Sequence, residues 1–143
     1  MVTNIVKKSD LTSPVIIHNR TVARAEAFAS TLPSEKVTIA KTLEEGVAKS
    51  DVIFSCVGDD AAVREIYAQF VANDVKGKLF VDCSTIHPDT TEELETMIEK
   101  KGGMFVAMPV FGAPAMADGG QLICVLAGKK DAVDKVKPYT KGV

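Results

Sequence analysis

Polar or flexible residues replace apolar ones abruptly at three places in the chain. Asn-Arg-Thr at residues 19–21, Val-Gly-Asp at residues 57–59 and Ser-Thr at residues 84–85 each stand at the end of a short apolar run. An arginine can bind a phosphate through charge-assisted hydrogen bonds, and paired hydroxyls can hold a small carboxylate or a carboxamide. The sequence contains no serine–histidine–acid arrangement typical of a catalytic triad, and no spacing of metal-ligating residues, beyond what chance would produce. These residue types therefore favour the binding of a phosphorylated small molecule.

The elements that carry these residues are expected to alternate between strands and helices. The run DVIFSCV at residues 51–57 is almost entirely apolar, which is typical of a strand buried on both faces. Residues 109–120 are interpreted as a loop rich in Gly, Ala and Pro. The alternation predicts a doubly wound α/β domain with a parallel sheet, in which ligands bind at the carboxyl ends of strands. Strands are expected at residues 15–18, 37–39, 51–57, 78–81, 105–108 and 122–126, and helices at residues 1–8, 21–32, from 42, 58–71, 88–101 and 131–139.

Composition limits the class of protein. The 143 residues suffice for one domain, and 46% hydrophobic with 25% charged residues predicts a packed core. The net charge is −2 and no basic run exceeds a lysine pair, which argues against nucleic-acid and anionic-membrane partners. Three cysteines inside apolar runs indicate buried thiols in a reducing compartment. We expect a cytoplasmic location. A mitochondrial location stays open as an alternative, because a transit peptide could have been lost with the N-terminus.

The segment at residues 19–21 has two interpretations. Arg20 beside Asn19 suits a 2′-phosphate on an adenosine ribose, whereas an acidic residue there would favour the free ribose hydroxyls. The alternative is a polar strand end in which Thr21 caps the following helix. The phosphate-binding run G-x-G-x-x-G, which should precede this strand by about 20 residues, is absent from the chain.

The segment after residue 82 also admits both kinds of role. Ser84 and Thr85 are interpreted as ligand-binding residues because they follow a strand, whereas Asp89 is interpreted as a helix cap. His18 lies on an apolar strand and is interpreted as a core histidine with satisfied hydrogen bonds.

Together these segments resemble the β-hydroxyacid dehydrogenase family, specifically the NADP-binding domain shared by 6-phosphogluconate and 3-hydroxyisobutyrate dehydrogenases. Four runs carry the resemblance, in the family's order and spacing. They are Asn-Arg-Thr after a strand, DVIFSCV followed by GDD, the D-x-S-T-I-x-P run of residues 82–88, and the P-V-x-G run that begins at residue 109 and ends at the glycine of residue 120. The resemblance covers essentially the whole chain.

The resemblance implies a set of site residues and a cofactor, NADP in preference to NAD. The substrate it implies is a small hydroxy acid. The family usually has Ser-Gly-Gly where this chain has Phe-Gly-Ala at residues 111–113, which favours a smaller or more apolar substrate than a sugar acid. The residues implied to bind the cofactor are Asn19, Arg20, Thr21, Val57, Gly58, Ala62 and Thr85, and those implied to bind the substrate carboxylate are Ser84, Gly112 and Ala113.

Two parts of the family's pattern are expected to lie outside residues 1–143. The first strand with its glycine-rich loop should precede Met1, and the catalytic lysine and the helical second domain should follow Val143. We therefore expect residues 1–143 to be an incomplete NADP-binding domain with no catalytic residue of its own. Without the first strand, the strands at residues 15–18 and 51–57 should face a gap. We expect either marginal stability or direct pairing of these two strands.

The leading hypothesis is an NADP-dependent oxidoreductase that interconverts a small 3-hydroxy acid and its semialdehyde or keto acid, inactive as residues 1–143 alone. Its partner is a small-molecule substrate, and full-length relatives are expected to be homo-oligomers. An imine reductase-like enzyme would share this domain. A non-catalytic nucleotide-binding or interaction module, and a weaker methyltransferase-like alternative, also remain open because fold alone does not settle function.

Overall fold

The strands form three separate sheets in the computed structural model, which describes residues 1–143. In chain order the strands are β1 (Val15–Ile17), β2 (Val37–Ile39), β3 (Val52–Ser55), β4 (Leu79–Asp82), β5 (Met104–Ala107), β6 (Val110–Phe111), β7 (Ile123–Cys124) and β8 (Ala127–Gly128). The four-stranded sheet has the order β3-β4-β5-β8, in which only β8 is antiparallel. Strands β1 and β2 pair in parallel, and β6 and β7 form an antiparallel pair.

Seven helices connect and cover these strands. Parallel neighbours such as β3 and β4 are joined through a helix, which confirms the doubly wound α/β class that the alternation predicts. No helix combines the length and the apolar composition needed to cross a bilayer. The helices are α1 (Val2–Lys8), α2 (Val22–Ala29), α3 (Leu43–Ala48), α4 (Asp60–Phe70), α5 (Pro88–Glu99), α6 (Pro114–Gly119) and α7 (Lys130–Val136), with short 3₁₀ turns at η1 (Ser34–Lys36) and η2 (Lys137–Tyr139).

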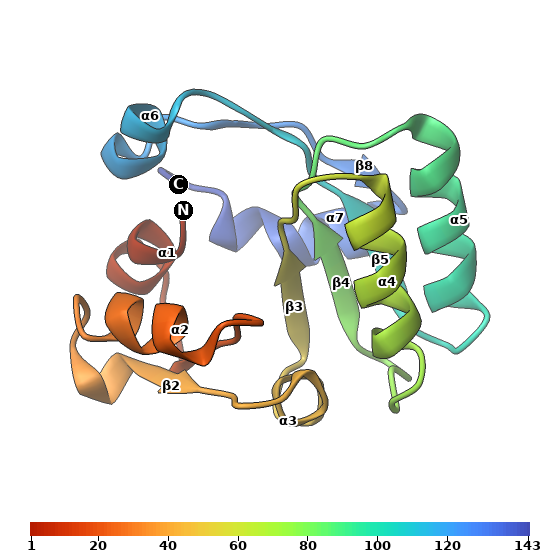
Figure 1. Ribbon diagram of the computed structural model, residues 1–143. Helices are drawn as coiled ribbons and strands as arrows, with labels where there is room; N and C mark the ends of the chain where they lie inside the picture. Colours follow the sequence, from red (N-terminus) through yellow and green to blue (C-terminus); the bar gives the residue numbers. More distant parts are fainter.

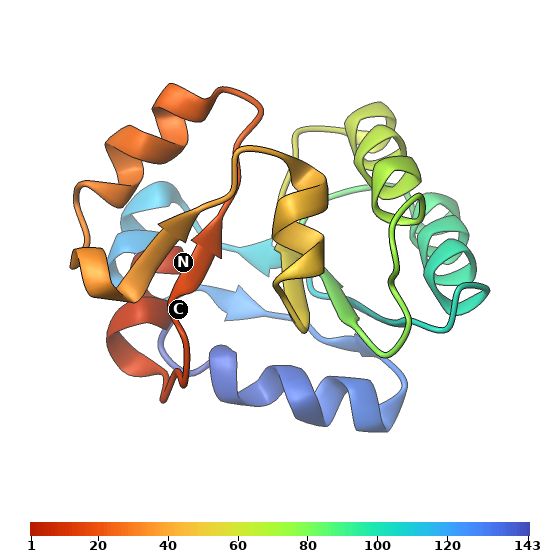
Figure 2. The same ribbon diagram turned by 90° about the horizontal axis from the view of Figure 1, so that it is seen from below.

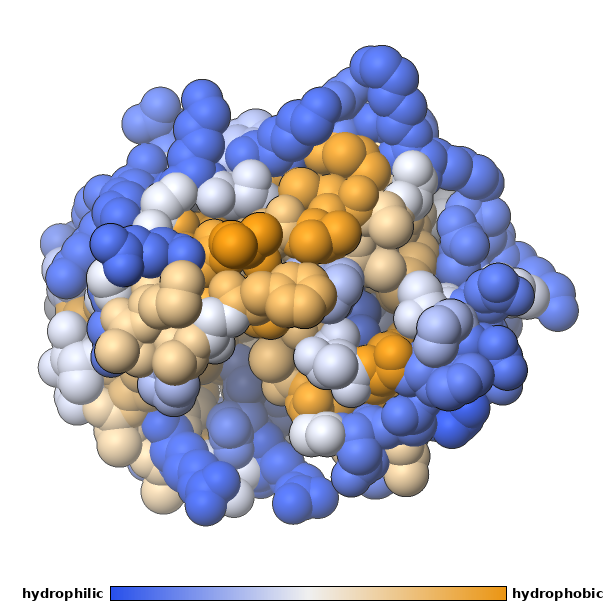
Figure 3. Space-filling view, turned by 90° about the horizontal axis from the view of Figure 1, so that it is seen from above, coloured by the Kyte–Doolittle hydropathy of each residue, from blue (hydrophilic) through white to orange (hydrophobic).

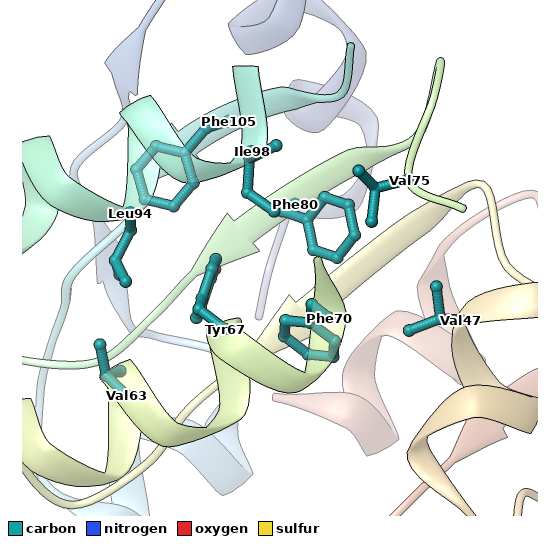
Figure 4. Packing of buried hydrophobic residues seen from close by; sticks show 9 residues of the cluster. All are labelled: Val47, Val63, Tyr67, Phe70, Val75, Phe80, Leu94, Ile98 and Phe105. Atoms are coloured by element: carbon teal, nitrogen blue, oxygen red, sulfur yellow. The ribbon is translucent and has the colours of Figure 1, made fainter. Parts of the chain in front are cut away.

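The core lies on both faces of β4 and β5. All four residues of β4 are buried, and alternate ones face opposite sides. Phe80 packs with Tyr67 and Phe70 of α4 on one face, together with side chains of α5, as Figure 4 shows. Leu79 packs on the other face with side chains of α7. The residues that follow the carboxyl end of β4 are therefore anchored by a buried and well-packed strand.

Strand β3 is an edge strand. It pairs with β4 on one side only, and Val52, Ile53 and Phe54 are half-buried. Ile53 packs against the core on one face of the sheet, and Val52 and Phe54 pack against the core on the other, so both faces of β3 are covered as predicted, but these three side chains stay half-buried rather than buried. The apolar run itself predicts the strand correctly.

The β1–β2 pair stands apart from the larger sheet. Figure 1 shows β2 running across the view and β3 running up it, and Figure 2 again shows the pair set to one side of β3. The direct pairing of β1 with β3, which is one of the two outcomes expected from the sequence, is therefore not formed. Both β1 and β3 keep one unpaired edge, because the pair is turned away from the direction of β3.

The stretch interpreted as a loop contains regular structure. Strand β6 and helix α6 lie within residues 109–120, and the single strand expected at residues 122–126 is replaced by the separate strands β7 and β8. Pro114 occupies the first turn of α6, and Gly120 ends it with a left-handed φ of 67°. These residues are typical helix start and stop signals, but the segment between them is short and rich in small residues.

Candidate functional site

The carboxyl ends of β3 and β4 lie side by side because the strands are parallel and in register. Ser55 at the end of β3 stands opposite Asp82 at the end of β4. Two residues further on, the backbone N–H of Val57 donates a hydrogen bond of 3.0 Å to Oγ of Ser84. The structure therefore brings the segments at residues 57–58 and 84–85 together at one edge of the sheet.

A buried carboxylate joins the two strands beneath this edge. Oδ1 of Asp82 accepts hydrogen bonds from the hydroxyls of Ser55 (2.8 Å) and Ser84 (2.9 Å). Asp82 is 2% exposed and Ser84 is 4% exposed. Burial raises the pKa of Asp82, although the hydrogen bonds from Ser55 and Ser84 oppose the rise. The only hydroxyl hydrogen of Ser84 thus points to Asp82, so in this arrangement Ser84 has none to donate to a substrate carboxylate.

Gly58 and Thr85 lie on the open side of the same edge. A Cβ added to Gly58 would meet no atom within 4 Å, and Thr85 is exposed. The backbone at Gly58 can therefore be approached closely by a ligand, and the hydroxyl of Thr85 can reach one. Both positions are thus accessible, and the ligand contacts that the resemblance implies for them stay predictions.

The amino end of α4 is capped by the chain itself. The N–H of Ala62 donates a 2.8 Å hydrogen bond to Oδ1 of Asp59, and Asp60 adds a second carboxylate to the first turn. Carboxylates already complement the positive end of the helix dipole there. An anionic ligand group beside Ala62 is consequently disfavoured, so an uncharged group such as a ribose fits there better than a phosphate.

The turn after β1 presents a free cation. Oδ1 of Asn19 accepts a 2.9 Å hydrogen bond from the N–H of Thr21, which shapes the turn. Arg20 is exposed and takes part in none of the six ion pairs of the structure. Figures 1 and 2 show this turn projecting from the β1–β2 pair toward β3. Its guanidinium is available for a phosphate.

Two predicted roles of polar residues are wrong in detail. Asp89 does not cap α5. His87 does, since its Nδ1 accepts the N–H of Asp89 at 3.3 Å, which places Asp89 inside the first turn. His18 is exposed rather than in the core, although its Nδ1 lies 3.1 Å from the carbonyl of Ala40 and is satisfied as predicted.

Gly112 and Ala113 lie at the start of α6, whereas Ser84 follows β4. Figures 1 and 2 place α6 at the opposite end of the molecule from α5. Gly112 adopts a φ of 147°, a backbone conformation that favours glycine, and a Cβ added there would lie 2.8 Å from Cδ2 of Leu122. Ser84 makes its hydrogen bonds to Asp82 and Val57, and no hydrogen bond joins it to Gly112 or Ala113.

Hydrogen bonds tie the amino-terminal part of α4 to the amino-terminal part of α5. Oδ1 of Asp60 accepts hydrogen bonds from the N–H of His87 (3.0 Å) and the hydroxyl of Thr90, which lower the pKa of Asp60. Arg64 donates to Thr90 (2.8 Å) and to Glu93 (2.7 Å). Sequence reasoning missed this clamp and the Asp82 network. The Asp-x-Ser spacing of residues 82 and 84, which puts both side chains on one side of a strand, was the available signal for the network.

The chain has relatives among known families and proteins. Residues 1–142 match the family described as the NAD binding domain of 6-phosphogluconate dehydrogenase. The NADH-dependent oxidoreductase ucdB of Aspergillus ustus is 35% identical over 98% of this chain and 48% of its own length. The cytokine-like nuclear factor N-PAC of Danio rerio is 31% identical over 94% of this chain and 28% of its own length. The chain thus spans at most about half the length of these curated relatives.

Solved structures share the fold. The 3-hydroxyisobutyrate dehydrogenase of Mycobacterium tuberculosis, solved with L-serine, superposes with a TM-score of 0.78 at 22% identity, over 87% of this chain and 42% of that one. Further structures of this fold hold NADP⁺ or NADPH. At this level of identity the similarity establishes the Rossmann-like fold.

Proposed function

The chain belongs to the family of the NAD binding domain of 6-phosphogluconate dehydrogenase, an NAD(P)-binding domain of oxidoreductases, and from this premise we propose that it binds NADP. The oxidoreductase would interconvert a small 3-hydroxy acid and its semialdehyde or keto acid by hydride transfer. The cofactor supplies the hydride chemistry. The residues of this chain would bind and orient it, and we assign no catalytic residue among them.

The observation that supports NADP is the unpaired guanidinium of Arg20. It follows β1, where a family member must meet the adenosine ribose, and it has no acidic partner. A 2′-phosphate would supply that partner through charge-assisted hydrogen bonds. Asn19 and Thr21 would hold the turn, and the backbone at Val57 and Gly58 would approach the rest of the cofactor.

Thr85 would approach the nicotinamide end of the cofactor, and Ala62 would lie beside an uncharged part of it. For the substrate carboxylate we propose the backbone at Gly112 and Ala113, and Ser84 only if its hydroxyl turns away from Asp82. The assignment of Thr85, Ala62, Gly112 and Ala113 rests on the family resemblance, and the hydrogen bond from Ser84 to Asp82 sets the condition on Ser84.

Exposed apolar side chains support a substrate with an apolar part. Phe111 of β6 is 59% exposed, and Ile123, its partner in β7, is 62% exposed. These strands cross the top of the molecule in Figure 1, and Figure 3, which looks onto that face, shows apolar residues gathered there. A sugar acid with several hydroxyls would leave such side chains without matching contacts.

Thermal melting with each nucleotide tests the proposal. A ligand at about 100 times its dissociation constant stabilises the folded state by roughly 2.7 kcal/mol, which for a chain of this size raises the melting temperature by roughly 5–10 °C. We expect this shift with NADP and a smaller one with NAD at the same concentration. Arg20→Ala should weaken NADP binding about 10- to 100-fold and leave NAD binding unchanged.

NAD is the internal control, because it lacks the 2′-phosphate and meets the same remaining contacts. A chain that melts at the same temperature with and without either nucleotide refutes cofactor binding. Equal binding of NADP by the Arg20→Ala variant and by the unaltered chain refutes the assigned role of Arg20.

A second candidate function is a non-catalytic nucleotide-binding module. The similarity to N-PAC, which is named a nuclear factor, favours it. This candidate predicts nucleotide binding without turnover in the full-length protein, whereas the oxidoreductase predicts NADPH formation with a 3-hydroxy acid. An imine reductase-like enzyme predicts turnover with NADPH and an imine in place of the hydroxy acid.

A further inference from the structure

A chain of buried hydrogen bonds runs from the core to the turn after β3. Oη of Tyr67 lies 3.1 Å from Oγ of Ser55, Ser55 donates to Asp82 at 2.8 Å, and Ser84 donates to the same oxygen at 2.9 Å. Oγ of Ser84 in turn accepts the N–H of Val57 at 3.0 Å. Tyr67 is fully buried and packs against Phe70 and Phe105, so this chain is anchored in the aromatic core.

The direction of each hydrogen follows from the carboxylate. A serine hydroxyl has one hydrogen, and Ser55 and Ser84 both direct theirs to Asp82. Tyr67 must then donate to Ser55. The oxygen of Ser84 is left with lone pairs only, which makes it an acceptor for the N–H of Val57. Asp82 therefore sets the orientation of a hydroxyl that bonds to the backbone of the turn.

The hydroxyl of Ser84 takes the place of a missing ladder bond. The parallel ladder continues as far as the N–H of Cys83, which donates to the carbonyl of Ser55 at 2.7 Å. The next bond of a regular parallel ladder would join the N–H of Val57 to the carbonyl of Cys83. Instead, the N–H of Val57 goes to the Ser84 side chain, at the point where the two strands part.

We propose that Asp82 and Ser84 are positioning residues that fix the backbone at Val57 and Gly58 for close approach of the cofactor. Beyond Gly58 the next fixed point is Asp59, which caps α4. The turn at residues 57–58 is thus held at both ends. The side chain of Ser84, just after β4, holds one end, and the side chain of Asp59, which caps α4, holds the other. The contact with cofactor rests on the proposed function, whereas the fixing of the turn does not.

Replacing Ser84 tests this role by two independent measurements. Ser84→Ala removes the acceptor, and Ser84→Cys keeps nearly the same shape with a much weaker acceptor. Ser55→Ala is the matched control, because Ser55 bonds to the same oxygen of Asp82 but does not touch Val57. The measurements are hydrogen exchange of the Val57 amide in the nucleotide-free chain and the dissociation constant of NADPH by its fluorescence.

In both Ser84 variants we expect exchange at Val57 to accelerate about tenfold relative to amides of β4, and NADPH to bind about tenfold more weakly. Ser55→Ala should lower the melting temperature and leave both quantities near those of the unaltered chain. Should one Ser84 variant not fold, the other still provides both measurements.

Unchanged exchange at Val57 in the Ser84 variants overturns the proposal. So does faster exchange with unchanged NADPH affinity, because the turn would then be fixed without serving the cofactor. Equal losses in Ser55→Ala would show a general effect of the network and would also overturn it. If the unaltered chain binds neither nucleotide, the proposed function fails, and the exchange at Val57 still decides whether Ser84 fixes the turn.

Discussion

Replacing Gly58 by alanine should raise stability and lower cofactor affinity at the same time. Gly58 does not have a positive φ, and an added Cβ would meet nothing within 4 Å. A glycine-to-alanine change at such a site restricts the unfolded chain and stabilises the folded one by about 0.4–1 kcal/mol. The melting temperature should therefore rise by roughly 1–4 °C.

The same methyl group would occupy the space that the cofactor is proposed to use. Forcing an extra methyl group into a packed contact costs about 1–3 kcal/mol, so NADPH should bind roughly 5- to 150-fold more weakly. Calorimetry of the nucleotide-free variant measures the first effect, and a fluorescence titration with NADPH measures the second.

Gly46→Ala is the matched control. Gly46 lies in α3, at the other end of β3, and its added Cβ would make an ordinary contact of 3.6 Å with Ala40. It should stabilise the chain by up to about 1 kcal/mol, the difference between glycine and alanine in a helix, and leave NADPH affinity unchanged. Unchanged affinity in Gly58→Ala would refute close approach at Gly58, and a lower melting temperature would refute the open space around it.

Three further outcomes are expected. Amides on the unpaired edges of β1 and β3 should exchange faster than those between β4 and β5, because no strand covers them; full protection of both edges would contradict the separate sheets. Since burial raises the pKa of Asp82 above its ordinary value of 3.8, its contribution to stability is fully present below about pH 4 and is lost as the pH rises through the raised pKa. Melting from pH 4 to 8 should therefore show a decline that Asp82→Asn reduces, and an identical decline in the variant would be evidence against this. Gly112→Ala should destabilise the chain by about 1–3 kcal/mol, because it combines a φ of 147° with a Cβ 2.8 Å from Leu122; an unchanged urea midpoint would show that this strain is absent.

Local patterns determined most of the secondary structure. Apolar runs located β3 and β4 within a residue or two, and Asp59 and Thr42 both cap helices through their side chains. The position of Arg20 at a strand end was also readable, because it depends only on where an apolar run stops. Short elements between glycines and prolines, such as β6 and α6, could not be predicted, because so few residues show no hydrophobic periodicity.

The sequence by itself determined the alternation of strands and helices and the residue types at three strand ends, since these depend on neighbours along the chain. Only the tertiary structure decided which strands pair, that β3 is left with an open edge, and that Ser84 is buried against Asp82. Those outcomes depend on contacts between residues far apart in the sequence. Asp82 and Ser55 are 27 positions apart, and only the register of two parallel strands brings them within a hydrogen bond of each other.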